Sequence, residues 1–218
     1  MTIPRRTSPH RADWDAVRAG EADLDMLSHV VAEAFIDLAP SRWLITDLNA
    51  RRSIFPGYFS IYLEHVLAVG IVLTTPGRTA AALWVPGGPN APGPPDSYDE
   101  RLAVATGPWL SRFLAFDDAL DSHHPTGMPH QHLAILAVHP DQQGRGIGTR
   151  LLDVWHATLE EDGMPAYLEA SSPRSRDLYL AHGYALVPDA PYHLPDGGPP
   201  MWPMWRQPGV PTGRHDAL

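Results

Sequence analysis

Three glycines at alternate positions stand in the run Gln143-Gly144-Arg145-Gly146-Ile147-Gly148-Thr149. An apolar run ending in Leu136-Ala137-Val138 precedes them, and a helical pattern begins directly after them. Glycines let a backbone turn tightly and approach a ligand closely, while the start of a helix offers unpaired N–H groups and a positive dipole end. These residues predict a binding site for phosphate, with a pyrophosphate at the start of the helix.

The two familiar nucleotide loops do not describe this segment. A dinucleotide fingerprint needs a glycine at position 149, where this chain has Thr149, and a P-loop needs Gly-Lys-Ser/Thr in a chain that contains no lysine. The pattern that remains is Gln143-x-x-Gly146-x-Gly148, five residues after the predicted strand that ends at Val138. This pattern resembles the acetyl-CoA loop of the GNAT superfamily of N-acetyltransferases.

A second motif extends the resemblance over the second half of the chain. Members of the superfamily carry Leu-Tyr-x-x-x-Gly-Phe after the next strand, and Leu178-Tyr179-Leu180-Ala181-His182-Gly183-Tyr184 occupies that place. The stretches 82–84 and 166–174 are most similar to the puromycin N-acetyltransferase branch. The resemblance implies the GNAT fold, an α/β (α+β) architecture in which helices flank a central mixed, mostly antiparallel sheet.

The resemblance also implies which residues hold acetyl-CoA. Main-chain groups of Leu136, Ala137 and Val138 are expected to pair with the pantetheine arm, and the Val138 amide to polarise the carbonyl. Amides of the loop are expected to hold the pyrophosphate, with Arg145 and Arg150 adding positive charge. Many members have an asparagine seven residues before the tyrosine, where this chain has Ser172, whose hydroxyl replaces only part of the amide's hydrogen bonding. The full predicted set is Leu136, Ala137, Val138, Gln143, Gly144, Arg145, Gly146, Ile147, Gly148, Thr149 and Ser172.

Acetylation of an amine needs a base that removes a proton and an acid that protonates the leaving thiolate. Tyr179 matches the superfamily's tyrosine and is the predicted acid, with a buried core aromatic as the alternative interpretation. Two residues compete for the base. His132 lies where several members carry a catalytic glutamate, and an imidazole titrates near neutral pH. Glu169 is a carboxylate on an otherwise apolar strand, which suits a proton-transfer role, a substrate ammonium or an ion pair with arginine.

Composition limits the class of protein. The chain has 218 residues, a net charge of −9 and no cysteine, and all sixteen basic residues are arginine. Without cysteine there is no thiolate nucleophile, so direct acyl transfer is favoured. The negative charge argues against a nucleic-acid partner. No apolar run reaches the roughly 20 residues of a membrane span, and no signal-peptide core follows the N-terminus. We therefore expect a cytoplasmic protein without a membrane partner.

Helical and strand periodicity predicts the elements around the motifs. A helix is expected from Leu24 to Leu38, two shorter helices between Trp43 and Val66 broken at Pro56-Gly57, and a hairpin over 71–85. Helical spacing returns over 97–120, the helix after the glycine loop ends at Gly163, and Pro165–Ala170 is a strand. Ser172-Pro173 begins the helix that carries Tyr179. Short strands at 185–187 and 202–206 complete the sheet, the latter at an edge because it contains Pro203.

The domain organisation follows from these elements. Residues 1–20 are expected to be a flexible leader, 21–206 a single acetyltransferase domain, and 207–218 a flexible tail. The Pro/Gly-rich segment 86–96 is a loop that either covers the cleft or is a surface insertion. His123, His124 and His130 are expected to be solvated loop residues rather than a metal site, because no spaced carboxylate or cysteine completes a ligand set.

The leading functional prediction is direct transfer of an acetyl group from acetyl-CoA to a primary amine of a small molecule, such as an antibiotic or aminonucleoside. Antibiotic resistance would be the biological role of such an activity. The alternatives are acetylation of a protein or peptide and a CoA-binding regulatory module without catalysis. The oligomeric state stays open, a homodimer included.

Overall fold

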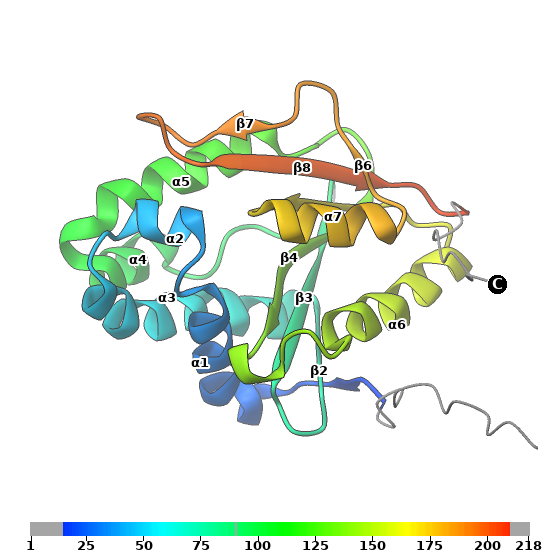
Figure 1. Cartoon of the computed structure of the whole chain (residues 1–218), viewed down its shortest axis with the longest axis horizontal. Coiled ribbons are helices and arrows are strands. Elements are labelled where there is room, and N and C mark those ends of the chain that lie inside the picture. The colour runs from blue at the N-terminus through cyan, green and yellow to red at the C-terminus, as the bar shows by residue number, and fades with distance from the viewer. Residues whose placement is uncertain (1–14, 90, 210–218) are drawn as a thin grey trace, which may run out of the picture.

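The computed structural model describes residues 15–89 and 91–209. Their strands form a sheet in the order β1-β2-β3-β4-β5-β8-β6, with β7 added to β8 (Figure 1). Neighbouring strands are antiparallel except for β4 and β5, which run parallel. This confirms the predicted mixed, mostly antiparallel sheet. The strands are β1 (Val17–Arg18), β2 (Ile71–Thr74), β3 (Ala80–Gly87), β4 (His130–Val138), β5 (Ala166–Ala170), β6 (Ala185–Leu186), β7 (Tyr192–His193) and β8 (Pro200–Arg206).

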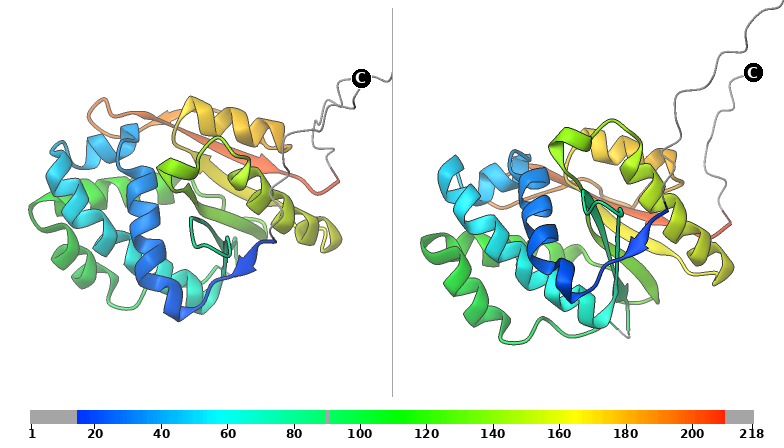
Figure 2. Two further views of the ribbon diagram at one scale, coloured as in Figure 1. Left: turned by 60° about the horizontal axis from the view of Figure 1, so that its bottom comes forward. Right: turned by 90° about the horizontal axis from the view of Figure 1, so that it is seen from below.

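Helices cover both faces of the sheet (Figure 2). On one face Leu83 and Ile135 belong to a core with the first five helices, and on the other Trp84 and Leu133 belong to a core with the last two. Within the described ranges, no helix combines the length and apolar character needed to cross a membrane. The helices are α1 (Leu24–Phe35), α2 (Ala39–Leu44), α3 (Leu48–Val69), α4 (Tyr98–Thr106), α5 (Leu110–His123), α6 (Ile147–Glu161) and α7 (Pro173–Ala181).

The prediction of two helices broken at Pro56 was wrong. Helix α3 runs through Pro56, and the break lies earlier, after Leu44. A proline removes one helical N–H, which a long helix packed in a core tolerates. Asp47 sets the new start, because its side chain accepts a hydrogen bond from the Ala50 amide at 2.7 Å. Helix α1 ends at Phe35, earlier than expected, and Pro40 lies in the first turn of α2.

Two further boundaries differ from the sequence prediction. The helical segment 97–120 is divided into α4 and α5, because Gly107 has a φ of 53° and Pro108 follows it in a short 3-10 turn. Strand β3 extends through Gly87, which is the beginning of the segment predicted to be a loop. Residue 90 lies outside the described residues.

Strand β8 is not the edge strand that Pro203 was taken to indicate. It lies between β5 and β6, and Pro203 is opposite Glu169 of β5. On the other side, the Pro203 carbonyl accepts a bond from the Val187 amide at 3.1 Å, while the Val187 carbonyl accepts from Ala190 at 3.3 Å. Pro203 has no N–H to offer the Val187 carbonyl, and the Ala190 amide in this turn takes its place as the donor. Pro203 is therefore tolerated where β6 ends. Strand β7 was not predicted.

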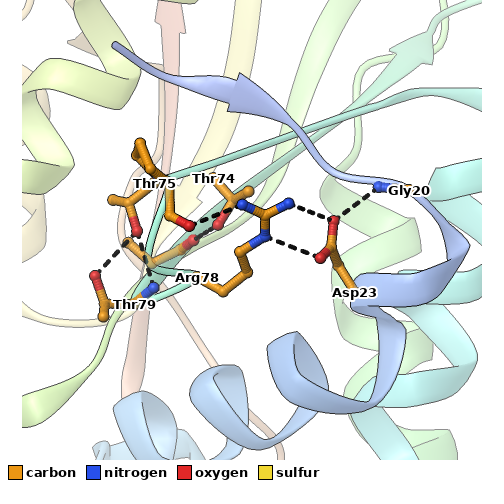
Figure 3. Close-up of polar contacts among 8 residues, drawn as sticks. Gly20, Asp23, Thr74, Thr75, Arg78 and Thr79 are labelled. Carbon is orange, nitrogen blue, oxygen red and sulfur yellow. Dashed lines mark hydrogen bonds and ion pairs between the residues drawn. The ribbon is translucent and has the colours of Figure 1, made fainter. Parts of the chain in front are cut away.

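The N-terminal part of the described chain joins the sheet. Strand β1 pairs with Leu73 and Thr74 of β2, within the segment predicted to be a flexible leader. In the turn before β3, Arg78 donates to Asp23 from Nε at 2.9 Å, and Asp23 also accepts from the Gly20 amide at 3.1 Å (Figure 3). The hydrogen bond from Arg78 lowers the pKa of Asp23. These contacts fix residues 17–23 against the β2–β3 hairpin. The leader residues 1–14 and tail residues 210–218 lie outside the described residues.

Strand β4 changes its pairing partway along its length. Leu83 of β3 is opposite Ile135 and Trp84 is opposite Leu133, so Ala134 is an extra residue that forms a β-bulge. On its other side β4 pairs with β5 only through Gln131 and His132. Beyond these pairs the strands separate. The edge of β4 is therefore left unpaired over the residues that lead to the glycine loop.

Candidate active site

A cavity of about 600 Å³ lies where β4 and β5 separate. It is lined by Leu136, Val138 and Tyr179, which pack in the same core as α6 and α7. It is also lined by Phe55 and Phe59 of α3, which pack in the core on the other face of the sheet. Because these residues belong to cores on opposite faces, the cavity passes through the gap in the sheet. The volume falls within the range of small-molecule sites in proteins.

The glycine loop forms one end of this cavity. Gly144 and Gly146 both have a φ of 75°, a backbone conformation that strongly favours glycine. Gly146 precedes the first residue of α6, and the first N–H bonded within the helix is that of Arg150, to the Gly146 carbonyl at 3.0 Å. The amides of Ile147, Gly148 and Thr149 therefore have no helical acceptor, and all three residues line the cavity. This geometry suits a pyrophosphate.

The unpaired edge of β4 offers main-chain groups beside the loop. The His139 amide donates to the carbonyl of Thr79, the residue before β3, at 2.9 Å, and Ala137 is opposite Ala81 of β3. By strand alternation Ala137 therefore also points its main-chain groups at β3. Leu136 and Val138 point away from β3, toward the gap. Gln143 donates from Nε2 to the Val138 carbonyl at 3.0 Å, which leaves the Val138 amide available. The expectation for Ala137 was wrong, because its main chain serves the sheet and its side chain lies in the core.

The basic residues near the cavity differ from those expected. Arg145 does not line the cavity, and Arg150 bonds to Asp15 at 3.2 Å. Arg174, at the start of α7, does line the cavity, and no role was predicted for it. The sequence around Arg174 contains no phosphate-binding motif. Its position in the cavity is therefore evident only from the structure.

Ser172 lines the cavity but also begins α7. Its hydroxyl accepts from the Ser175 amide at 3.1 Å, and its own amide donates to the Ser175 hydroxyl at 3.1 Å. This capping box confirms the expected start of the helix. The hydroxyl predicted to bind the cofactor is therefore already committed to the helix.

Tyr179 is 7% exposed and lines the cavity from α7. Burial raises the pKa of its phenol. Among the described residues its hydroxyl makes no hydrogen bond, whereas the neighbouring Tyr184 hydroxyl lies 3.0 Å from Nε2 of His156. The proton of Tyr179 is thus retained at neutral pH and unshared, as a proton donor in the cavity requires.

Glu169 lines the cavity from β5, where alternate residues such as Leu168 are buried in the core on the opposite face. Burial raises the pKa of its carboxyl group to about 7. Tyr192 of β7 donates to its Oε1 at 2.9 Å, which lowers that pKa without cancelling the effect of burial. No arginine is bonded to Glu169 in the described part of the chain. The partner that sequence reasoning missed, Tyr192, lies on a strand too short to be recognised.

His132 also lines the cavity, with neighbours that the sequence did not suggest. Its ring lies 4.7 Å from His124 and 5.6 Å from Tyr167, measured between ring centroids. Burial, together with the nearby His124 and His130, holds the pKa of His132 well below its usual value. His130 is 2% exposed and lies 3.2 Å from His124 between Nε2 atoms, so the expectation of solvated loop histidines was wrong for these two. No group of three potential metal ligands gathers within residues 15–89 and 91–209.

The far end of the cavity is aromatic. Four residues of α3 at helical spacing line it, together with residues of α1, α2 and α5. The sequence predicted helices in this part of the chain but could not say which of their faces line a site. The aromatic members are Phe35, Phe55, Tyr58, Phe59, Tyr62 and Phe116.

Comparisons with known proteins agree with this geometry. The family model described as "Acetyltransferase (GNAT) domain" matches residues 112–186, which include the glycine loop and Tyr179. A crystal structure described as histone acetyltransferase HPA2 and related acetyltransferase, from Corynebacterium glutamicum, is 26% identical with a TM-score of 0.67. The alignment covers 91% of this chain and 98% of that one.

More distant structures share the fold. Arylalkylamine N-acetyltransferase 2 from Aedes aegypti is 12% identical with a TM-score of 0.61, covering 89% of this chain and 99% of that one. The ribosomal-protein-S18-alanine N-acetyltransferase from Escherichia coli is 17% identical with a TM-score of 0.51, covering 94% and 99%. Residues 112–186 thus match a GNAT acetyltransferase domain, the fold is that of GNAT acetyltransferases, and the protein is an acyltransferase.

Proposed function

We propose that the protein transfers an acetyl group from acetyl-CoA directly to a primary amine of a small molecule. The observation that carries this proposal is the cavity through the sheet, which has Tyr179 on one face and Glu169 on the other. A base and an acid in one cavity are what attack by an amine and departure of a thiolate require. The chain has no cysteine to carry an acyl intermediate.

The residues present fit acetyl-CoA. The free amides at the start of α6 suit the pyrophosphate, and Arg174 adds positive charge to the same cavity. The unpaired main-chain groups of Leu136 and Val138 suit the amides of the pantetheine arm, as an added strand would. Acetyl-CoA supplies a reactive thioester when it is bound. The Val138 amide is positioned to donate to its carbonyl oxygen.

Glu169 is the better base of the two candidates. A base works best when its pKa lies near the operating pH, and the pKa of Glu169 is about 7. His132 is held neutral with a pKa well below its usual value, so it accepts a proton poorly. Glu169 removes a proton from the substrate ammonium, and the free amine is then the nucleophile. Attack of the amine would form the C–N bond of the new amide, and as the C–S bond breaks Tyr179 would donate its phenolic proton to the leaving sulfur. The second proton lost by the acylated nitrogen would return the phenolate of Tyr179 to its neutral form.

The shape of the acceptor end favours a small molecule over a polypeptide. Helices α1, α2, α3 and α5 all contribute lining residues, so the acceptor end is walled by several helices, whereas an extended polypeptide needs an open groove. A protein amine and a non-catalytic CoA sensor remain the competing functions. Membership of the puromycin N-acetyltransferase branch and a role in antibiotic resistance stay predictions, as does a cytoplasmic location.

The test is CoA release from acetyl-CoA across a panel of small amines and short peptides, for the wild type and for Tyr179→Phe and Glu169→Gln. We expect turnover with a small amine and a loss of kcat of about 100-fold or more in each variant, the usual contribution of a general acid or base. The wild-type kcat/KM should rise with pH with a midpoint near 7, the pKa of Glu169, and Glu169→Gln should lose that step.

The matched control is Tyr184→Phe, which removes a buried tyrosine hydroxyl of the same motif outside the cavity lining. It should keep kcat. Full activity in Tyr179→Phe would remove Tyr179 as the acid, and binding of acetyl-CoA without turnover on any acceptor would favour the sensor.

A further inference from the structure

We propose that the amine acceptor is a hydrophobic monoamine, with a single ammonium group on an aromatic body. This inference rests on the proposed function and specifies its substrate class. The observation behind it is the contrast between the two ends of the cavity. The cofactor end is built from glycines, serines and main-chain groups, whereas the acceptor end is built from rings and aliphatic side chains.

The aromatic wall is held together by contacts between its own rings. Phe55, Tyr58, Phe59 and Tyr62 lie on one face of α3, because their spacing of three and four residues places them together. Ring centroids of Phe55 and Phe59 are 5.5 Å apart at 76°, and those of Tyr58 and Tyr62 are 5.3 Å apart at 74°. Such edge-to-face contacts fix the rings, so an apolar body meets a prepared surface.

Charge is scarce along the same wall. Among the described residues that line the cavity, only Glu169 and Arg174 have a charged side chain. His132 also lines the cavity, and its lowered pKa keeps its ring neutral. Arg174 belongs to the cofactor end, at the start of α7. The acceptor end therefore offers one carboxylate to one ammonium. A second ammonium would be buried without a partner, which is costly.

Asp117 is an acidic group behind the wall, and its carboxylate oxygens already accept hydrogen bonds. Tyr98 donates to it at 2.7 Å and Tyr62 at 3.2 Å, and the two tyrosine hydroxyls also contact each other. Burial raises the pKa of Asp117 to about 6. Asp117 does not line the cavity. Of Asp117, Tyr98 and Tyr62, only Tyr62 lines the cavity. Asp117 therefore offers no carboxylate to a second ammonium group in the cavity.

The experiment compares acceptors that share a primary amine but differ in body. The probes are 2-phenylethylamine, 1,4-diaminobutane, glucosamine and a short glycine-rich peptide, each tested with the wild-type protein and acetyl-CoA. We expect kcat/KM for 2-phenylethylamine to exceed that for each polar probe by about 100-fold, the effect of burying one phenyl ring. The preference should appear in kcat/KM for the amine and leave the KM for acetyl-CoA unchanged.

A pair of variants on α5 links the preference to the wall. Phe116 lines the cavity, whereas Leu114 on the same helix is 41% exposed and lies outside the lining. Phe116→Ala should lower kcat/KM for 2-phenylethylamine by about 10-fold or more and change that for 1,4-diaminobutane little. Leu114→Ala should preserve the ratio between the two amines. Thermal unfolding of both variants shows whether they fold.

The outcomes separate this inference from the proposed function. Comparable turnover of 1,4-diaminobutane, glucosamine or the peptide would overturn the hydrophobic monoamine while supporting the acetyltransferase. A protein that fails to bind acetyl-CoA would overturn the proposed function itself. If Phe116→Ala does not fold, the wild-type comparison of amines still decides the inference.

Discussion

The pKa of Glu169 depends on neighbours that come from distant parts of the chain. Its strand places it in the gap beside β4, and Tyr192 reaches it from β7 with a hydrogen bond of 2.9 Å. The ring of Tyr192 is in turn stacked on His123 at 3.7 Å between centroids. The hydroxyl of Tyr192 is thus held in a fixed position, and its bond stabilises the ionised carboxylate.

Replacing Tyr192 by phenylalanine should move the pH dependence of the reaction. The Tyr192 hydrogen bond lowers the pKa of Glu169, so its loss should raise that pKa above about 7. The carboxylate would then be protonated at neutral pH, and the midpoint of kcat/KM should shift upward by about one pH unit, the usual size of one hydrogen bond to a charged group.

The pH profile of initial rates measures this shift. His193→Ala, an exposed neighbour on the same strand, is the control and should keep the wild-type midpoint. An unchanged midpoint in Tyr192→Phe would mean that the hydrogen bond does not set the basicity of Glu169. Activity regained at high pH distinguishes the expected effect from a simple structural loss.

At the scale of residues, most of the residues that sequence reasoning singled out lie together in the structure, and their roles stay predictions. The glycine loop, Tyr179 and the lone carboxylate Glu169 all line the cavity. It could not anticipate that the main chain of Ala137 serves β3, because strand alternation depends on the pairing register. It missed Tyr192 and Arg174 for a related reason. Long-range contacts place them, and no local pattern records such contacts.

Helix α7 combines a structural cap with the tyrosine that we propose as the acid. Ser172 and Ser175 exchange hydrogen bonds at its start, and Tyr179 lies two turns later. The orientation of Tyr179 therefore depends on the first turn being formed. Ser172, which the family resemblance assigned to cofactor binding, thus caps the helix.

We expect Ser172→Ala to lower the free energy of unfolding by about 1 kcal/mol, the usual cost of losing a cap. Ser172→Asn should retain stability to within about 0.5 kcal/mol, since asparagine caps equally well. Denaturant unfolding measures both changes. Equal stability in the alanine variant would show that the cap adds little, and a lower KM for acetyl-CoA in the asparagine variant would reveal a cofactor contact at this position.

Element types were predicted better than element boundaries. Helix α3 continues through Pro56 because its packing in the core outweighs one missing hydrogen bond. Strand β8 accepts Pro203 inside the sheet because a turn after β6 supplies the missing donor. In both cases tertiary contacts compensate for a proline that, from the local sequence alone, predicts the end of the helix or strand. Such compensation depends on segments remote in sequence and is not visible in a local pattern.

At the scale of the whole molecule, ligand binding should stabilise the fold. A ligand that binds only the folded state at 100 times its dissociation constant adds about 2.7 kcal/mol. For a domain of this size we expect acetyl-CoA to raise Tm by roughly 5–10 °C under that condition. Differential scanning fluorimetry with acetyl-CoA, and with acetate as the control, measures the shift. No shift at saturating acetyl-CoA would contradict the proposed cofactor site.

The short pairing between β4 and β5 has a consequence for how a ligand sits in the sheet. The register between them comprises Gln131 with Ala166 and His132 with Tyr167. Strands β1–β4 and β5–β8 are thus two parts of the sheet joined by a short ladder. One part leads to the glycine loop, and the other carries Glu169 and is followed by the helix of Tyr179. A ligand bound in the gap would contact both parts and connect them along the stretch where strand pairing does not.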